Sequence, residues 1–265
     1  MSLYFRSYRS SSAGNCLALW TRDSCVLIDC GIRTLRDSRA VLHGHGAAHG
    51  PVAAVLVTHA HGDHLNRLAA RALVEDGIEI RAPQAVASQL RARIAMRGGR
   101  ACPVRSLPSG AERVSDFNIQ AIRLSHQPEV PTFGFVIEAG HGSAQRKVVV
   151  ATDFNDPRDV LPHLADADFV FVEANHDAEL LRLHFNPNSR YHLPNAKTAG
   201  LLVEAVRSRR SAPRHVVLGH LSAERNRDHL AVAEVQAAFA RRGMKLPFLL
   251  DTAPKHAPSA VIKLS

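Results

Sequence analysis

Apolar residues in the first quarter of the chain form short runs that are separated by turn-forming residues. Residues 3–8 and 16–20 alternate or run apolar, which predicts two short strands. Between them, the Ser-rich stretch 10–15 with its glycine predicts a loop. Residues 25–29 and 52–58 are apolar runs that end in Asp29 and Thr58, and they predict two buried strands.

Helical spacing of apolar residues appears between further strand-like runs. We expect helical structure up to about residue 42 and then a flexible loop at 43–50, where histidines are interspersed with glycines. The other predicted helices cover residues 64–76, 84–97, 195–209 and 227–242. The other predicted strands cover residues 78–81, 117–124, 132–138, 147–152, 168–174, 215–218, 246–250 and 260–264.

The order of these elements indicates one α/β domain. Strands occur in both halves of the chain, with helices between and after them, and such a chain can pack two sheets face to face with helices outside. We therefore expect a four-layer αββα sandwich that spans residues 1–265. The chain shows no internal repeat and no long linker, so nothing in it indicates a second domain.

Composition agrees with a globular protein, because 46% of the residues are hydrophobic and 22% are charged. No apolar run approaches the roughly 18 residues that cross a membrane, and residues 1–6 lack the apolar stretch of a signal peptide. We therefore expect a cytoplasmic protein without a membrane partner. Cys16, Cys25, Cys30 and Cys102 form no Cys-x-x-Cys pair, and we expect them to stay reduced.

The formal net charge of +9 changes the picture of possible partners, because a basic surface attracts polyanions, above all nucleic acid. Composition alone leaves a second explanation open, which is an arginine-rich coding preference with an ordinary soluble surface. Arg91, Arg93, Arg97 and Arg100 lie in or just after one predicted helix. They would follow a phosphate backbone or form an ordinary solvated helix face.

Candidate chemistry concentrates in the run Thr58-His59-Ala60-His61-Gly62-Asp63-His64, where the second buried strand ends. His59 and His61 are two residues apart, so their side chains project to the same side of an extended chain. Imidazole and carboxylate groups together suit Zn, Fe or Mn. A His-rich surface loop is the ordinary alternative, but it does not explain the preceding buried strand or the Asp and Gly within the run. We therefore predict that this run ligates metal.

The same run resembles the signature of the metallo-β-lactamase superfamily, whose other elements follow in order. Asp29 resembles the first acid of that superfamily, and His126 resembles the next ligand. Asp153 resembles the acid that usually bridges two metals, and His220 resembles the last histidine. Each of these residues alone would be an ordinary cap or turn residue, but all of them lie in the right order at predicted strand ends.

The resemblance implies a ligand set for two divalent ions, which would be Zn, Mn or Fe. One ion would take His59, His61 and His126 as ligands, and the other would take Asp63, His64 and His220. Asp153 would bridge the two ions. Asp29 would lie behind the ligands and orient the histidines by hydrogen bonds.

A closer resemblance, to the WalJ-like subgroup of that superfamily, covers nearly the whole chain. The subgroup motifs SSGNC, LIDAG, EANHD, HLSN and HLSxxNN resemble residues 11–16, 27–31, 173–177, 192–195 and 220–226. Two positions depart from the motifs, with Pro194 where Ser is usual and Arg225 where the first Asn is usual. The subgroup is linked to DNA exonuclease activity, so the resemblance implies a nucleic-acid partner, DNA more than RNA.

The chemistry implied is hydrolysis of a phosphodiester by a hydroxide held between two ions about 3.5–4 Å apart, which attacks in line. Asp63 and His192 are the residues that we expect to act in catalysis. His192 is not needed to complete the ligand set, so it would contact the scissile phosphate or assist the leaving group. The alternative for His192 is a structural loop histidine.

Residues near the predicted strand ends are candidates for substrate binding. Asn175 and His176 follow a buried strand at the same sheet end as the ligands, so we expect them to line the pocket. Ser12 and Asn15 could offer polar groups to a phosphate. A plain β-turn is the alternative for the loop that contains them.

Other functions within the superfamily stay open. One alternative is a small-molecule hydrolase that acts on a thioester, a lactone or a cyclic phosphodiester. Glyoxalase-like and β-lactamase-like members usually have Gly-Gly soon after the histidine cluster, whereas Leu65, Asn66 and Arg67 follow it here. A non-catalytic metal-binding protein is disfavoured because every ligand position is intact. The sequence leaves open the native metal, the choice of DNA or RNA, cutting from an end and the oligomeric state.

Overall fold

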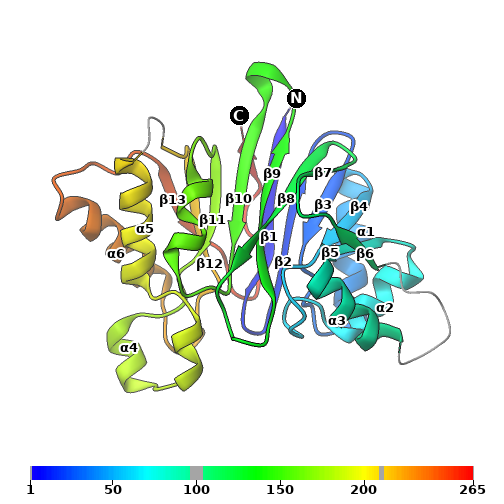
Figure 1. Cartoon of the computed structure of the whole chain (residues 1–265), viewed down its shortest axis with the longest axis horizontal. Helices are drawn as coiled ribbons and strands as arrows, with labels where there is room; N and C mark the ends of the chain where they lie inside the picture. Colours follow the sequence, from blue (N-terminus) through cyan, green and yellow to red (C-terminus); the bar gives the residue numbers. More distant parts are fainter. Residues whose placement is uncertain (1, 96–103, 209–211, 265) are drawn as a thin grey trace.

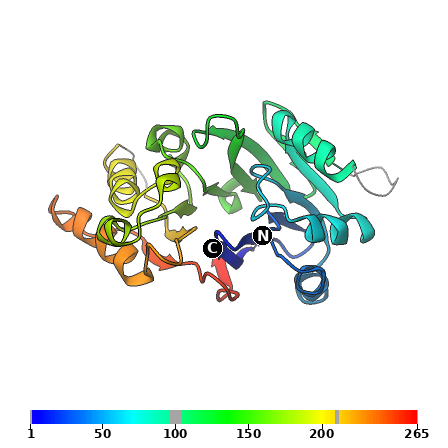
Figure 2. The same cartoon turned by 90° about the horizontal axis from the view of Figure 1, so that it is seen from below.

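The computed structural model describes residues 2–95, 104–208 and 212–264. Two seven-stranded sheets pack face to face (Figures 1 and 2). The first sheet contains, from edge to edge, β14 (Ile262–Leu264), β1 (Leu3–Ser11), β2 (Gly14–Trp20), β3 (Cys25–Ile28), β4 (Val52–Leu56), β5 (Glu79–Pro83) and β6 (Val104–Leu107). The second contains β13 (Leu249–Thr252), β12 (His215–Gly219), β11 (Phe169–Glu173), β10 (Arg146–Ala151), β9 (Thr132–Ala139), β8 (Phe117–Leu124) and β7 (Glu112–Val114).

Helices cover the outer face of each sheet (Figure 2). The first sheet is covered by α1 (Leu35–His49), α2 (Arg67–Glu75) and α3 (Gln84–Ala95), and the second by α5 (Asn195–Arg207) and α6 (Asp228–Ala240). A short helix, α4 (Ala178–Leu183), projects at the bottom of Figure 1. The 3-10 helices are η1 (Gly142–Ala144), η2 (Pro157–Asp159), η3 (Leu161–Leu164) and η4 (Pro187–Tyr191). No helix among the described residues is both long and apolar enough to span a membrane.

Three apolar layers hold the sandwich together, because the central strands are apolar on both faces. On β10, Val148 and Val150 point into the layer between the sheets, whereas Val149 faces the layer beneath α5 and α6. Phe5 of the first sheet packs against Phe169 of the second, with ring centroids 4.6 Å apart. This alternation follows from the two-residue period of a strand. The predicted four-layer αββα sandwich is confirmed.

The predicted flexible loop at 43–50 is wrong, because α1 continues through it to His49. His45 is buried, and its Nδ1 lies 2.8 Å from the hydroxyl of Tyr8. Its ring also packs edge-on against Trp20, with centroids 5.1 Å apart. Glycine in a helix costs about 1 kcal/mol relative to alanine. The packing of this histidine offsets that cost, which the local sequence pattern does not reveal.

Two other predicted boundaries are shifted. The loop expected at 10–15 is only a two-residue turn, because β1 continues to Ser11 and β2 begins at Gly14. The strand expected at 246–250 begins only at Leu249, because Pro247 has no N–H to donate to the ladder. The cysteine prediction agrees with the described part of the chain, where Cys16, Cys25 and Cys30 are buried and free, and Cys102 lies outside the described residues.

Both sheets contain parallel strands that end at one edge of the sandwich. In the first sheet, β3, β4, β5 and β6 pair in parallel, and in the second β10, β11, β12 and β13 do so. Open α/β sheets place their binding sites beyond the carboxyl ends of such strands. Polar residues that follow these strands therefore occupy the favoured position for a site.

Candidate metal centre

Strand ends from both sheets bring polar side chains together. Asp29 and His59 come within three residues of the ends of β3 and β4 in the first sheet. His126, Asp153 and His220 come within three residues of the ends of β8, β10 and β12 in the second. All five are buried, although polar groups at strand ends are usually solvated.

Three of these strand ends turn sharply through a left-handed backbone. The φ angles of Asp29, Asp153 and His220 are 61°, 59° and 52°. Asp and His tolerate this region better than most side chains, yet it still costs energy for any residue with a Cβ. The turn re-aims each side chain from the sheet toward the space between the strand ends. Such outliers cluster at functional sites because the surrounding structure must hold them there.

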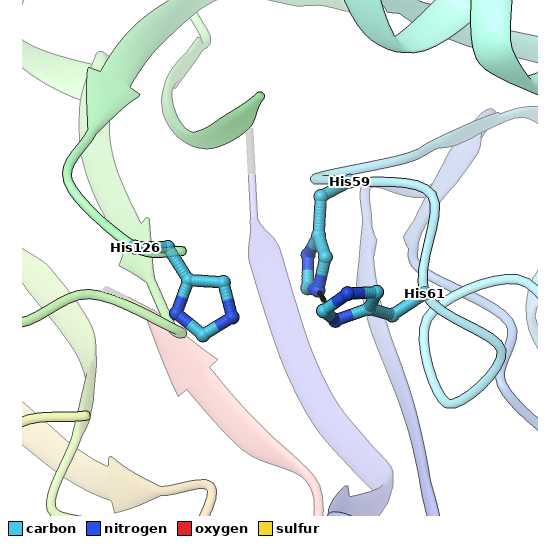
Figure 3. Close-up of side chains that lie close together, drawn as sticks. All are labelled: His59, His61 and His126. Atoms are coloured by element: carbon cyan, nitrogen blue, oxygen red, sulfur yellow. Dashed lines mark hydrogen bonds between the residues drawn. The ribbon is translucent and has the colours of Figure 1, made fainter. Parts of the chain in front are cut away.

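His59, His61 and His126 form the first group of potential ligands. One ring nitrogen of each lies within 4.8 Å of the others, and His59 Nε2 is 3.0 Å from His61 Nδ1. Figure 3 shows His126, from the second sheet, across from His59 and His61. Two nitrogens bound at about 2.1 Å to one tetrahedral zinc lie about 3.4 Å apart. The observed spacing therefore suits a shared cation.

Asp63, His64 and His220 form a second group within the same 4.8 Å limit. Asp153 adjoins this second group, because its Oδ2 is 3.1 Å from His64 Nε2 and 3.7 Å from His220 Nε2. Asp153 also forms a potential ligand group with His59 and His64. One carboxylate thus reaches both halves of the cluster.

The outer nitrogens of these histidines are anchored by oxygen atoms. His64 Nδ1 lies 2.7 Å from Asp29 Oδ2, and His126 Nδ1 lies 3.0 Å from the carbonyl oxygen of Tyr191. His220 Nδ1 lies 2.9 Å from Glu173 Oε1. A donated Nδ1–H fixes the ring and leaves Nε2 as a lone-pair donor, which is the arrangement of metal-binding histidines.

The electrostatics of the two groups differ. Burial lowers the pKa of each histidine in the first group, so these rings are neutral donors. Burial also opposes protonation of the histidines in the second group, but the charge of Asp153 outweighs it and raises the pKa of His220 to about 10. In turn, burial would raise the pKa of Asp153, but the charge of His220 holds it well below its usual range.

This donor set fits divalent cations. Asp153 Oδ2 and His220 Nε2 are buried and have no hydrogen-bond partner among the described residues. Leaving such atoms without a partner is costly, and a cation would satisfy both. A mixture of imidazole and carboxylate ligands suits Zn, Mn or Fe. Metal binding would also replace the protons that now balance the buried carboxylates.

Comparison with known proteins agrees with this geometry. Residues 25–220 match the family model described as a beta-lactamase superfamily domain. The chain belongs to the metallo-β-lactamase superfamily. The exodeoxyribonuclease YycJ of Bacillus anthracis is 25% identical over 254 residues, which cover 92% of this chain and 91% of that protein. The exodeoxyribonuclease WalJ of Streptococcus pneumoniae is 25% identical over 258 residues, which cover 92% of each chain.

Solved structures share the fold of this metallo-β-lactamase superfamily member. The metallo-beta-lactamase fold protein YhfI from Bacillus subtilis superposes with a TM-score of 0.69 at 18% identity, over 99% of this chain and 100% of that one. The predicted superfamily is therefore confirmed, and the chain is similar to the two exodeoxyribonucleases, as the WalJ-like resemblance implied. The protein is a metal-dependent hydrolase, as the sequence predicted.

Glu173 is a site residue that the sequence analysis missed. It is fully buried at the end of β11, and its Oε1 lies 2.7 Å from His192 Nδ1 as well as 2.9 Å from His220 Nδ1. Its Oε2 accepts a hydrogen bond from the backbone N–H of Phe154. The charge of His192 outweighs burial and holds the pKa of Glu173 at about 2. A charged residue that ends an apolar strand, within the EANHD motif, was the available signal.

The predicted catalytic residue His192 lies beside the metal-binding groups. Its ring centroid is 5.1 Å from that of His126 and 5.4 Å from that of His220. His192 lines a cavity of about 260 Å³ that Asp63, Asp153 and His220 also line. Because Nδ1 is held by Glu173, Nε2 is the nitrogen left for another partner. The cavity is where a substrate would meet both His192 and the donor groups.

The four predicted substrate residues divide into two kinds. Ser12 is exposed and Asn175 is buried, and both line the cavity. Asn15 is buried instead beneath the metal-binding run, with its Nδ2 3.3 Å from the carbonyl oxygen of Asp63. His176 lines a neighbouring cavity and lies 3.3 Å from Asn175 through its Nδ1.

Of the four arginines that would follow a phosphate backbone or form a solvated helix face, the structure describes Arg91 and Arg93. Arg91 donates hydrogen bonds to Val104 and Ser106, which fasten α3 to β6. Arg93 donates to the carbonyl oxygen of Leu65. Arg97 and Arg100 lie outside the described residues.

Proposed function

We propose that this protein is a dinuclear metal-dependent nuclease that hydrolyses phosphodiester bonds of DNA from an end. The observation that carries the proposal is the combination of two adjacent donor groups with His192, which Glu173 holds at the same cavity. The exodeoxyribonucleases YycJ and WalJ support the choice of DNA. The net charge of +9 supports a polyanionic substrate.

We assign the metal ligands to the two groups of the cluster. One ion would take His59, His61 and His126, the other would take Asp63, His64 and His220, and Asp153 would bridge them. When bound, the two ions supply a nucleophile from water at neutral pH and neutralise charge on the phosphoryl oxygens. Asp29 and Glu173 hold the ligand rings in place.

The residues of the chain that surround the ions position the substrate and move protons. His192 Nε2 donates a hydrogen bond to a non-bridging oxygen or a proton to the leaving oxygen, and Glu173 stabilises the imidazolium from which that proton comes. Asp63 lines the same cavity, and its carboxylate accepts a hydrogen bond from the attacking water. Ser12 and Asn175 contact the phosphate from the cavity wall.

A substrate panel tests the proposal. The protein loaded with Mn, Zn or Mg is incubated with linear and circular single-stranded DNA of equal length, bis(p-nitrophenyl) phosphate, a lactone and a thioester. We expect linear DNA to be degraded and circular DNA to resist, because an exonuclease needs an end. Turnover of the lactone or thioester with no cleavage of nucleic acid would replace the proposal by a small-molecule hydrolase.

Salt dependence separates a nuclease from a general phosphodiesterase. Each phosphate that the protein neutralises releases counterions, so cleavage of long DNA should fall steeply as salt rises. Hydrolysis of bis(p-nitrophenyl) phosphate, which contacts few basic residues, should change far less. Equal salt dependence for the two substrates would argue against an extended nucleic-acid contact.

A further inference from the structure

The segment between β11 and α5 exposes two large apolar side chains beside the metal centre. This segment contains α4 and η4, and α4 projects from the sandwich in Figure 1. Phe185 is 78% exposed and Leu183 is 74% exposed, whereas the chain buries most of its large apolar side chains. Exposed aromatic rings next to a polar site are typical of a binding surface.

Phe185 lines a cavity of about 390 Å³, which we call the Phe185 pocket. Leu181, Arg190 and Lys197 are among its other lining residues. The Phe185 pocket and the metal-centre cavity share Asn186, Ser189 and His192 as walls. A polymeric substrate that places one unit in the metal-centre cavity can therefore place the adjoining unit in the Phe185 pocket.

The charges of the Phe185 pocket suit an anion. Arg190 and Lys197 are exposed, and no carboxylate is among the described residues that line the pocket. The ammonium group of Lys197 makes no hydrogen bond or ion pair with any residue in the described ranges. The pKa of Asp156 is lowered mainly by hydrogen bonds from Arg158, and the charge of Lys197 adds a smaller contribution. Arg190 is held over the ring of Tyr191, with its guanidinium carbon 4.6 Å from the ring centroid.

Tyr191 connects the Phe185 pocket to the metal centre. Its carbonyl oxygen anchors His126, while its hydroxyl accepts a hydrogen bond from Arg190 over 2.5 Å. The position of the basic group is therefore tied to that of a proposed metal ligand. This contact holds the guanidinium near the metal centre, where it can reach a phosphate next to the scissile one.

We propose that the Phe185 pocket binds an unpaired nucleoside that adjoins the scissile phosphate. The base stacks on Phe185, and Arg190 and Lys197 contact the neighbouring phosphate. An aromatic platform combined with basic side chains is how single strands are bound without sequence preference. The inference rests on the proposed nuclease function and makes the substrate a single-stranded end, because a paired base is not free to enter a separate pocket.

Substitution of Phe185 tests this proposal. For Phe185→Ala, the KM for a linear single-stranded oligodeoxynucleotide should rise about tenfold relative to the KM for bis(p-nitrophenyl) phosphate, which has no base. Phe185→Tyr should restore the wild-type ratio. Leu183→Ala is the matched control, since Leu183 is equally exposed on the same segment but does not line the pocket. An unchanged ratio in Phe185→Ala would overturn the proposal.

Abasic oligonucleotides test whether a base is the group that Phe185 contacts. A single abasic site is moved along the strand and KM is measured for wild type and Phe185→Ala. At one position the two changes should be non-additive, because each removes one side of the same contact. Full additivity at every position would show that Phe185 does not stack on a base.

Binding measurements separate failure of this proposal from failure of the nuclease function. A fluorescent phosphorothioate oligothymidine, which resists hydrolysis, is titrated with the metal-loaded protein. If wild type cuts no nucleic acid yet binds this probe about tenfold more tightly than Phe185→Ala does, the pocket stands and the nuclease function falls. If wild type cuts DNA, and wild type and Phe185→Ala bind the probe equally tightly, the pocket proposal falls and the nuclease function stands.

The oligomeric state is measured on the same preparations. If wild type is a dimer and both Leu183→Ala and Phe185→Ala are monomers, the exposed surface joins copies of this chain, and the pocket proposal is overturned.

Discussion

Glu173 accepts a hydrogen bond from Nδ1 of His192 over 2.7 Å, although Glu173 lies fully buried at the end of an apolar strand. The same oxygen also accepts from His220, so one carboxylate fixes the proposed proton donor and a proposed metal ligand. A buried carboxylate in this position is stabilised by these two rings. Its substitution should therefore affect catalysis and metal binding together.

Glu173→Gln keeps the size of the side chain but removes its charge. We expect the loss of about 10–100-fold in activity or metal affinity that is usual for groups behind a metal ligand. The measurement is kcat together with metal content on one preparation. Asp251→Asn, at an exposed position on β13, is the control and should match wild type. Wild-type activity in Glu173→Gln would show that the carboxylate serves only the fold.

His192→Ala should keep both metals and its thermal stability but lose about 10²–10⁴-fold in turnover, the usual contribution of a general acid. His229→Ala, on the exposed side of α6, is the control and should keep the metal content, thermal stability and turnover of wild type. Metal content, a thermal melt and kcat are measured for both variants. Loss of metal would instead make His192 a ligand, since it also groups with Asp153, Glu173 and His220. Unchanged turnover would make it a structural residue.

Asp153→Ala should remove at least one of two divalent ions per chain, because the carboxylate reaches both donor groups. Elemental analysis after dialysis gives the stoichiometry for wild type and variant. The variant also loses the carboxylate charge that raises the pKa of His220. Full occupancy by two ions in Asp153→Ala would remove this residue from the bridge.

Gly31→Ala should disrupt the turn that carries the metal-binding run. A Cβ at position 31 would lie 1.7 Å from the carbonyl oxygen of Asp63, so the backbone would have to move. We expect the free energy of unfolding to fall by at least about 2 kcal/mol, as for severe overpacking. Gly62→Ala is the matched control, because no atom lies within 4 Å of its added Cβ. Chemical denaturation and metal content compare the two, and equal stability would contradict the close approach.

His45 should make the fold sensitive to mild acid. Burial, with the charges of His49 and Arg6, lowers its pKa to about 4, below the ordinary value of 6.5. The unfolded chain therefore binds the proton more readily, so the stability that neutral His45 contributes is complete above pH 6.5. It is lost as the pH falls from 6.5 to 4.

His45→Asn keeps an acceptor for the Tyr8 hydroxyl but cannot be protonated. Between pH 7 and pH 4, wild type should lose on the order of 2 kcal/mol more unfolding free energy than this variant. Tyr8→Phe is the control, since it retains the imidazole and should keep the acid sensitivity. Parallel stability curves for wild type and His45→Asn would show that His45 does not titrate in this range.

Strand periodicity explains how much of the fold could be predicted from the sequence. The run 52–58 is apolar at every position up to its end, which predicted a strand between two apolar layers; Ala54, Val55 and Leu56 of β4 are buried there, whereas Ala53 is exposed. The metal-binding run directly after it was equally visible, because its histidines and Asp63 are close in sequence. Both predictions depend only on neighbours along the chain, which is why the strand was found and why the histidines and Asp63 come together in one cluster, whereas metal binding by that cluster stays a prediction.

Long-range packing decided the remaining features. The helical state of His45 depends on Tyr8 of β1 and Trp20 of β2, which are distant in the sequence. The role of Glu173 depends on His192 and His220, which the chain brings to it from outside β11. No local pattern encodes such contacts, because they exist only once the sheets have packed.

The sequence by itself determined the secondary-structure period and the layer architecture and supplied the candidate donor residues for divalent metal, since each follows from the order of side chains along the strands. Only the tertiary structure decided which nitrogen of each ring faces the centre, that Asp153 reaches both donor groups, and that Phe185 borders the same cavity system. The physical reason is that left-handed turns at Asp29, Asp153 and His220 aim the side chains, and such backbone angles persist only where surrounding contacts hold them, as the hydrogen bond from the His220 N–H to Ser10 of the other sheet does.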